Sequence, residues 1–545
     1  MESSVSGKFA FAYDPEDWGS ELSPTNREPD DWLHEPDPRR DRMTDNDTNV
    51  LTGRGIANLG CLAFLAIIIL GVFAGYPIAS ELSKSRQSFA GGFNLGGING
   101  TGQVPDLPGN YGLIDKDTPT DALTYTPYTG QEQWELVFSD EFETDERTFY
   151  PGDDPYWEAV DLHYWGTNNM EWYDPSAITT KDGALEITLT DVPTKGKIYT
   201  GGMMSTWNKF CFTGGLFLAS VTLPGSPNVA GLWPAVWAMG NLGRAGFGAT
   251  LDGMWPYTYD SCDVGTLPNQ TTPDGLPIAA TVNGDEAADG ALSYLPGQKL
   301  SRCTCLGEEH PGPVHADGTY VGRAAPEIDM FEAQVLQAAT GVTQHEVSQS
   351  LQLAPFNEEY TWFNTSETLS IPNATMSALN GYKGGRYQQA ASVVSHTNAD
   401  CYEFDGSACF SLYGFEYKPG FDDAYVTWIN DGQLAWTITA GGLARDPGVE
   451  IGPRPIPVEP MYMILNLENF GFVDVENLIF PTKMRIDWIR VYQPPDSIRI
   501  GCDPDDFPTA AYIERFSEAY TNPNLTTWVD DYKQVFPKNK LVDQC

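Results

Sequence analysis

The sequence predicts an all-β protein in which an antiparallel β-sandwich follows one membrane-spanning helix. Two observations predict the sandwich: short segments of alternating apolar and polar residues recur between Trp134 and Tyr492, and turn residues rather than long amphipathic helices separate them. A third observation predicts the helix, because a charge-free apolar run lies well before the first of these segments.

The formal net charge of −43 is spread along the chain of 545 residues, including the part that is expected to fold. Such a charge opposes binding to nucleic acid and to the surface of anionic lipid, because both carry negative phosphates. A neutral ligand such as a sugar fits the charge better. An acidic surface that only keeps the protein soluble explains the charge at least as well.

The apolar run extends from about Ile56 to Ile78, and its centre between Cys61 and Phe73 is almost wholly apolar. A helix of this length spans a bilayer. A cleaved signal peptide would have a shorter apolar region after a brief basic start, whereas some fifty-five polar residues come first here. A buried helix of a globular domain is the other alternative. We assign residues 56–79 to a transmembrane signal anchor.

The residues around the anchor predict its orientation. Residues 1–55 are rich in Asp, Pro, Glu and Asn, so we assign them to a disordered cytoplasmic tail. A cytoplasmic N-terminus is favoured by the basic residues, which are Arg39, Arg40, Arg42 and Arg54 before the run and Lys84 and Arg86 after it. The chain is then a single-pass type II protein of the endoplasmic reticulum, Golgi or plasma membrane, with a luminal or extracellular C-terminal domain.

Glycosylation triplets and cysteines fit this orientation. The expected acceptor residues are Asn99, Asn269, Asn364, Asn373 and Asn524. A triplet at Asn46, on the other side of the anchor, shows that chance matches occur. Eight of the nine cysteines lie beyond the anchor, as in an oxidising compartment. We predict one local disulfide, between Cys401 and Cys409, and leave the other pairings open.

Composition divides the rest of the chain into three parts. Residues 80–130 are Gly-rich and then Pro-, Asp- and Thr-rich, which predicts a flexible stem. The sandwich is expected over residues 131–495, with its clearest strands at Trp134–Phe138, Gly183–Leu189, Gly215–Leu223, Ala424–Ile429 and Met484–Tyr492. Residues from about 240 to 326 break this rhythm as an insertion that is expected to shape or cover the site. Residues 496–545 form a C-terminal extension with a short helix near Ala510 to Tyr520.

The segment from Glu327 to Glu332 carries three carboxylates on a strand that is otherwise apolar. Acids at such positions are costly unless they have a chemical role. Alternate residues of a strand share a face, so Glu332 points away from Glu327 and Asp329 in a regular strand. A β-bulge near Met330 or Phe331 would turn Glu332 to the same face as the other two acids. With the bulge, like charges separate the pKa values into one ionised nucleophile and one protonated acid, as retaining glycoside hydrolysis requires. A solvated edge strand with chance acids is the alternative.

Tryptophan side chains are expected near these acids. The segment Gly231-Leu-Trp-Pro-Ala-Val-Trp237 supplies Trp233 and Trp237, and Trp207 and Trp172 are further candidates for stacking on sugar rings. For any single Trp, a place in the core is the alternative.

Five motifs together resemble the laminarinase-type family 16 glycoside hydrolases. They are Phe138-Ser-Asp-Glu-Phe142, Trp233-Pro-Ala-Val-Trp237, Glu327 to Glu332, Asn466-Leu467 and Arg485-Ile-Asp-Trp-Ile-Arg-Val-Tyr-Gln493. Further segments and the anchor narrow the resemblance to fungal type II membrane proteins of β-1,6-glucan assembly, and these segments are Ser205–Gly215, Trp255–Asp263 and Cys502–Pro504. The resemblance extends over nearly the whole chain from the anchor to Cys545.

The resemblance implies a concanavalin-like jelly roll in which Glu327 is the nucleophile, Asp329 tunes it and Glu332 is the general acid/base. The expected substrate-binding residues are Trp233, Trp237, Trp207, Asn169 and Gln349. Three departures from the family stand out, and one of them is the long insertion before Glu327. Gly214-Gly-Leu-Phe-Leu218 replaces a common Gly-Arg-x-Glu pattern, and Gln349 and Gln352 stand where laminarinases often have a His.

A zinc site is an alternative use of Cys303-Thr-Cys305 with His310 and His315. A one-residue gap between cysteines is unusual for tetrahedral zinc, and disulfides are more frequent in an oxidising compartment. We therefore expect no metal ion, and we expect no cofactor.

The sequence leads to two functional hypotheses. The first is a glucan-active retaining glycosidase or transglycosidase needed for fungal cell-wall β-1,6-glucan biosynthesis, in which Glu327 attacks the anomeric carbon and Glu332 protonates the leaving oxygen. The second keeps the fold as a non-catalytic glucan-binding or assembly factor of the secretory pathway. The presence of all three acids favours the enzyme. The residues that depart from the family pattern, at Gly214–Leu218 and at Gln349 and Gln352, keep the binding role open.

Overall fold

The computed structural model describes residues 37–39, 42–43, 53–75, 112–337, 343–355, 357–404, 406–469, 474 and 476–545. Contacts divide the chain into two units, residues 1–86 and residues 87–545. Most of the predicted tail, the end of the predicted anchor, the predicted stem up to residue 111 and the acceptor Asn99 lie outside the described residues.

An apolar helix forms most of the described part of the first unit. Helix α3 (Gly53–Leu70) continues into the π-helical turn η3 (Gly71–Gly75). The segment Ile56–Gly75 is long and apolar enough to cross a membrane, with a mean hydropathy of 2.6. The predicted helix is therefore present, while its insertion in a bilayer and its orientation stay predictions.

Within the described residues, the second unit contains two sheets of ten strands each. The first sheet runs in the order β1 (Thr124–Tyr125), β2 (Trp134–Asp140), β20 (Thr482–Gln493), β8 (Gly215–Thr222), β16 (Ser411–Lys418), β17 (Tyr425–Asn430), β18 (Gln433–Thr439) and β12 (Leu369–Ser370). Strands β5 (Ile178–Lys181) and β6 (Ala184–Leu189) extend it beside β20. All of these pairs are antiparallel, and the five strands named from the sequence are confirmed within a few residues.

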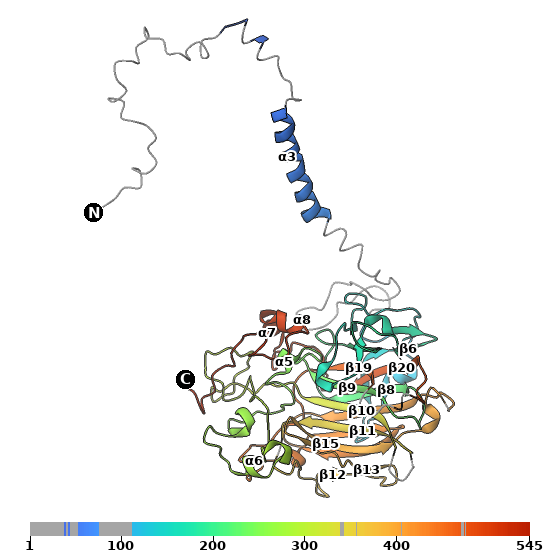
Figure 1. The fold of residues 1–545 in the computed structure, drawn as a ribbon. Helices are drawn as coiled ribbons and strands as arrows, with labels where there is room; N and C mark the ends of the chain where they lie inside the picture. Colours follow the sequence, from blue (N-terminus) through green and yellow to red (C-terminus); the bar gives the residue numbers. More distant parts are fainter. Residues whose placement is uncertain are drawn as a thin grey trace, which may run out of the picture. The chain divides into compact units, whose positions relative to one another are not determined.

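The second sheet runs in the order β13 (Ser377–Leu379), β15 (Gln388–His396), β11 (Thr343–Leu353), β10 (Glu327–Gln337), β9 (Leu232–Gly240), β19 (Met461–Asn469), β7 (Tyr199–Ser205) and β3 (Glu158–Ala159). Strand β14 (Gly384–Gly385) pairs with β15, and β4 (Glu171–Tyr173) runs parallel to β7. Figure 1 shows β19, β9, β10, β11 and β15 side by side in this order. The acid-bearing strand β10 is therefore central in its sheet.

The largest cluster of buried apolar side chains draws on strands of both sheets, including Phe217 and Phe415 from the first and Val236 and Leu351 from the second. The rings of Trp428 and Trp436 stack within it with centroids 4.1 Å apart. A shared core between two antiparallel sheets confirms the predicted jelly-roll β-sandwich.

The sandwich begins before the predicted boundary at residue 131. Residues 120–122 form the 3₁₀ turn η4, β1 pairs with β2, and the amide of Ser139 donates to the carbonyl of Leu113 over 2.9 Å. The ring of Tyr125 packs 5.3 Å from that of Tyr492. Residues 113–130 are thus held by strand pairing and ring contacts, which differs from the flexible stem that their composition predicted.

The predicted insertion lies between β9 and β10. It contains the short helices α5 (Gly248–Leu251) and α6 (Ala279–Val282) and a disulfide between Cys262 and Cys303. Its remaining helical turns are η7 (Val264–Thr266), η8 (Pro268–Gln270) and η9 (Glu286–Ala288). Elsewhere in the second unit, 3₁₀ turns connect strands at η5 (Trp165–Thr167), η6 (Pro175–Ala177), η10 (Ala399–Cys401) and η11 (Ala440–Leu443).

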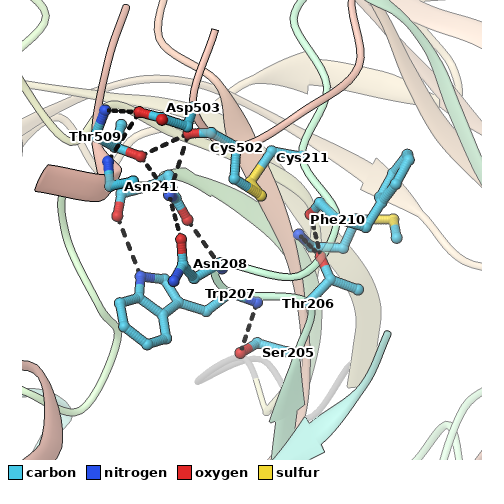
Figure 2. The surroundings of a disulfide bond; sticks show 12 residues. Ser205, Thr206, Trp207, Asn208, Phe210, Cys211, Asn241, Cys502, Asp503 and Thr509 are labelled. Carbon is cyan, nitrogen blue, oxygen red and sulfur yellow. Dashed lines mark hydrogen bonds between the residues drawn. A yellow bond between two sulfur atoms is a disulfide. The ribbon is translucent and has the colours of Figure 1, made fainter. Parts of the chain in front are cut away.

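The C-terminal extension contains α7 (Ala510–Arg515) and α8 (Ser517–Thr521), which confirms the predicted short helix. Disulfides tie the extension down at both ends, from Cys502 to Cys211 and from Cys545 to Cys305. Figure 2 shows the first of these bonds, beside which the Asn241 side-chain amide donates to the carbonyl of Cys502 and to the hydroxyl of Thr509. The predicted disulfide between Cys401 and Cys409 is also confirmed.

Four of the predicted glycosylation acceptors are exposed on the second unit, namely Asn269, Asn364, Asn373 and Asn524. Exposure is a requirement for glycosylation, and the modification itself stays a prediction. The cysteines of the zinc alternative are both disulfide-bonded, Cys303 to Cys262 and Cys305 to Cys545, so neither is free to bind a metal.

Candidate active site

A β-bulge in β10 brings the three acids to one face. The register of β10 shifts between Asp329 and Glu332 against β11, and between Asp329 and Phe331 against β9. Phe331 is consequently fully buried in the core, while Glu332 pairs with Ser348 as Asp329 pairs with Ser350. The predicted bulge is confirmed, and Glu327, Asp329 and Glu332 face the same side.

Glu327 receives hydrogen bonds on its carboxylate. The indole Nε1 of Trp255 donates to Oε2 of Glu327 over 2.6 Å, and a protonated Asp329 donates to Glu327 as well. Trp255 belongs to the insertion, so the insertion contacts the predicted nucleophile directly. Both donors favour the ionised form of Glu327, which is the form that can attack a sugar.

Asp329 is 1% exposed and lies between the other two acids. Its Oδ2 accepts from Nε2 of Gln352 over 2.8 Å, and its backbone carbonyl accepts from the indole of Trp428 over 2.7 Å. These contacts fix both the side chain and the backbone at the start of the bulge.

Glu332 is held by two neighbouring strands. Its Oε1 accepts from the indole Nε1 of Trp233 on β9 over 3.1 Å, and its Oε2 accepts from the hydroxyl of Ser348 on β11 over 3.3 Å. The predicted substrate-binding residue Trp233 therefore lies beside the predicted general acid.

Burial raises the pKa of all three acids. It raises the pKa of Glu327 to about 8, against the opposing hydrogen bond from Asp329. Burial and then the charges of Glu327 and Glu332 raise the pKa of Asp329 well above its usual range. Burial also raises the pKa of Glu332, against the hydrogen bonds from Trp233 and Ser348. The trio therefore retains protons near neutral pH, as a site with a general acid requires.

A second pair of carboxyl groups, Glu171 and Glu468, lies on the same sheet beyond Trp233. The hydroxyl of Tyr173 donates to Oε1 of Glu468 over 2.6 Å, and the side-chain amide of Asn169 donates to Oε1 of Glu171 over 2.6 Å. Burial raises the pKa of Glu171 to about 7, and burial followed by the charge of Glu171 raises the pKa of Glu468 to about 8. The predicted residue Asn169 thus binds Glu171, which the sequence had not singled out.

Trp237 lies on the acid-bearing face but is 6% exposed, and its indole donates to Oδ1 of Asn466 over 2.7 Å. Asn466 in turn donates to Glu468 over 3.2 Å. Trp237 pairs with Asp329 across the strands, so it connects Asp329 through Asn466 to the second pair of acids. Because its ring is buried, Trp237 does not offer an exposed face for stacking on a sugar.

The remaining two predicted binding residues are engaged away from the acids. The ring of Trp207 stacks 5.5 Å from that of Tyr520, lies 4.3 Å from the guanidinium of Arg244, and donates to the carbonyl of Asn241, as Figure 2 shows for the last contact. Gln349 points into the core, where its Nε2 donates to the carbonyls of Met330 and Ile429 over 3.0 Å each. Trp207 anchors the C-terminal extension, and Gln349 supports the bulge.

The insertion and the C-terminal extension cover one flank of the acid-bearing face. A buried cluster joins Trp237, Met239 and Tyr462 of the sheet to side chains of both segments, including Met254, Leu300, Tyr512 and Trp528. Strand β19 is consequently buried at every position, although an uncovered sheet face would show alternating exposure. Glu327 and Glu332 stay partly exposed beside this covered flank.

The chain is similar to solved glucanase structures. It shares 21% identity with the laminarinase catalytic domain from Thermotoga maritima, over 66% of this chain and 98% of that one, with a TM-score of 0.36. It shares 18% identity with the endo-β-1,3-glucanase from Pyrococcus furiosus, over 69% of this chain and 98% of that one, with a TM-score of 0.38.

Sequence similarity to fungal proteins is higher. The chain is 40% identical over 532 residues to the β-glucan synthesis-associated protein SKN1 of Candida albicans, covering 96% of this chain and 67% of that protein. It is 39% identical over 538 residues to the β-glucan synthesis-associated protein KRE6 of Saccharomyces cerevisiae, covering 95% of this chain and 69% of that protein. The sequence profile of the family "Beta-glucan synthesis-associated protein SKN1/KRE6/Sbg1" matches residues 20–545. The chain therefore belongs to the SKN1/KRE6/Sbg1 family of β-glucan synthesis-associated proteins.

Proposed function

We propose that the chain is a retaining glycosidase or transglycosidase that acts on β-glucan. The observation that carries the proposal is the bulge in β10, because it places Glu327, Asp329 and Glu332 on one face, with Trp and Ser donors aimed at the two glutamates. Retaining hydrolases of sugars use two carboxyl groups in this way, one as nucleophile and one as acid and base.

In the proposed reaction, Glu327 attacks the anomeric carbon of the donor glucan while Glu332 protonates the leaving oxygen. The hydrogen bonds from Asp329 and Trp255 favour the ionised, attacking form of Glu327 against the opposing effect of burial. In the second half, Glu332 removes a proton from water or from a glucan hydroxyl, which then displaces Glu327 from the sugar. Water gives hydrolysis and a glucan hydroxyl gives chain transfer.

The proposed biological role is in fungal cell-wall β-1,6-glucan synthesis. The relatives SKN1 and KRE6 are named for association with β-glucan synthesis, which supports this role. The apolar helix and the four disulfides support a type II membrane protein whose C-terminal domain folds in the oxidising secretory pathway.

Substitution of the two glutamates tests the proposal. The full chain in detergent is incubated with defined β-1,3- and β-1,6-linked oligosaccharides, and products are read by mass and by anomeric configuration. We expect Glu327→Gln and Glu332→Gln each to lower product formation by about 100- to 10,000-fold while glucan binding persists. Glu346→Gln is the matched control, because Glu346 is a buried glutamate on the neighbouring strand β11. Inverted products, or full activity in both variants, would reject the mechanism.

A non-catalytic glucan-binding role is the second candidate. Its specific support is that Trp255 occupies one carboxylate oxygen of Glu327 and that one flank of the acid-bearing face is covered. If the unmodified chain binds glucan but forms no product, and both glutamine variants sustain β-glucan synthesis in cells, this role replaces the catalytic one.

A further inference from the structure

Three exposed tyrosines gather at the edge of the acid-bearing sheet. Tyr294 is 42% exposed, Tyr382 58% and Tyr387 56%. We call these three residues the tyrosine platform. None of them belongs to the sequence motifs that contain the three acids or the candidate sugar-binding tryptophans.

Two distant segments build the platform. Tyr382 and Tyr387 flank β14, which pairs with β15 through a tight turn, and Tyr294 comes from the insertion. The amide of Tyr294 donates to the carbonyl of Arg386 over 2.7 Å, and the rings of Tyr294 and Tyr387 meet edge to face with centroids 5.9 Å apart. The guanidinium of Arg386 lies 4.9 Å from the ring of Tyr294 and 5.4 Å from that of Tyr387. The rings of Tyr294 and Tyr387 are therefore held in place while they remain exposed.

A chain of polar side chains connects the platform to the acids. Gln388 directly follows Tyr387, and its Nε2 donates to Oε1 of Gln352 over 3.4 Å, while Gln352 donates to Asp329 over 2.8 Å. Tyr382 is hydrogen-bonded to Gln388 and lies in the field of the Glu332 charge. The platform thus continues the acid-bearing face across β11 and β15.

The platform lies on the flank opposite to the covered one. The insertion and the extension bury Trp237, Met239 and Tyr462 on the β9 and β19 side. On the β11 and β15 side, the described residues present large exposed rings instead. A chain that reaches the acids from this side meets the tyrosines first.

The chemistry of the platform fits a neutral sugar chain. The charge of Arg386 is paired with Asp285 over 3.0 Å, and the chain as a whole is strongly acidic, which disfavours an anionic polymer. Tyrosine rings offer flat apolar faces to sugar rings, and their hydroxyls bind sugar hydroxyls.

We propose that the tyrosine platform binds the acceptor glucan, the chain that receives the glycosyl group from Glu327 in place of water. This inference rests on the proposed function. In the transfer step the ester bond between the anomeric carbon and Glu327 breaks, and a bond forms from that carbon to the acceptor hydroxyl oxygen. The proton of that hydroxyl passes to Glu332, so no further reactant is needed.

Binding is tested first, because it does not require catalysis. The full chain in detergent and the double variant Tyr382→Ala/Tyr387→Ala are compared by affinity electrophoresis in gels that contain soluble β-1,3- or β-1,6-glucan. Removing two stacking rings is expected to weaken binding to at least one glucan by about tenfold. Phe421→Ala is the matched control, because Phe421 is 42% exposed in the turn between β16 and β17 of the other sheet. Unchanged binding in the double variant, or no binding by the unmodified chain, overturns the proposal.

Product analysis then separates acceptor from donor binding. With an oligosaccharide donor, the double variant is expected to lower the ratio of transfer to hydrolysis products by about tenfold, while donor consumption persists. An equal loss of both products would place the tyrosines at the donor and overturn the acceptor role. If the unmodified chain forms no product, the proposed function and the acceptor role fail together, and binding alone decides whether the platform holds glucan. A change of oligomeric state without a change of glucan binding would identify a self-association surface instead.

Discussion

At the scale of single residues, the protonation of buried acids is the property that most directly connects structure to chemistry. Glu327 on β10 and Glu468 on β19 both have a pKa raised to about 8 by burial, and strand β9 lies between these two strands. Because raised carboxyl pKa values favour the neutral form, the acid-bearing face holds protons near pH 7 that an unfolded chain would release.

Glu468→Gln is predicted to change how stability depends on pH. The folded pKa of Glu468 is about 8 and its ordinary value is 4.5, so its contribution to stability is complete below about pH 4.5 and is lost as the pH rises through 8. Glutamine keeps the oxygen that accepts from Tyr173 and never ionises. The variant should therefore become more stable than the unmodified protein as pH rises, by up to about 1.4 kcal/mol per pH unit between these values.

Urea unfolding at pH 5, 6.5 and 8 measures this difference, and contributions shared by both proteins cancel. Glu135→Gln serves as control, because Glu135 is an exposed glutamate on β2 of the other sheet. Parallel stability curves for Glu468→Gln and the unmodified protein would contradict the prediction.

The sequence predicted the acids and their bulge because both follow from one short segment. In a regular strand Glu332 would face away from Glu327 and Asp329, so a shared face requires a bulge between Asp329 and Glu332. It did not predict Trp255 or Ser348 as partners, since they reach the acids from the insertion and from β11 and carry no local signal. Trp207 and Gln349 were assigned to sugar binding by residue type and position, but tertiary packing directs them to Tyr520 and to the core.

At the scale of elements, strands were predictable because alternation and turn residues are local, whereas most cysteine pairings were not. Cys401 and Cys409 are separated by 8 residues, and Cys211 and Cys502 by 291. A short separation limits which partner a cysteine can reach. The pairing of cysteines that lie far apart in the sequence depends on the whole fold, so the sequence did not predict it.

The two disulfides are predicted to stabilise the fold unequally. In the loop-entropy account, opening Cys401–Cys409 costs about 2.5 kcal/mol and opening Cys211–Cys502 costs about 6 kcal/mol, because the longer loop restricts the unfolded chain more. The double serine variants of each pair, compared by urea unfolding midpoint without reductant, measure the difference. Equal losses would show that native-state contacts rather than loop length set the contribution of each bond.

At the scale of the whole molecule, the sandwich, the insertion and the extension form one packed unit around the candidate site. Trp528 of the extension is 2% exposed, its amide donates to Asp252 of the insertion over 2.9 Å, and the ammonium of Lys299 lies 3.5 Å from its ring. The same stretch of the insertion carries Trp255, which contacts Glu327. The extension therefore supports the position of a residue at the predicted nucleophile.

Trp528→Ala is predicted to destabilise the protein by about 3–5 kcal/mol, because a large buried ring leaves a cavity against Tyr512, Phe516 and Tyr532. Val535→Ala is the control: Val535 is 81% exposed and contributes only its backbone carbonyl to Trp528, so its loss should change the urea midpoint little. Glucan product formation by Trp528→Ala, measured where the variant is still folded, should also fall, since the insertion that carries Trp255 loses its support. Full activity in a clearly destabilised variant would show that the extension stabilises the fold without positioning the site.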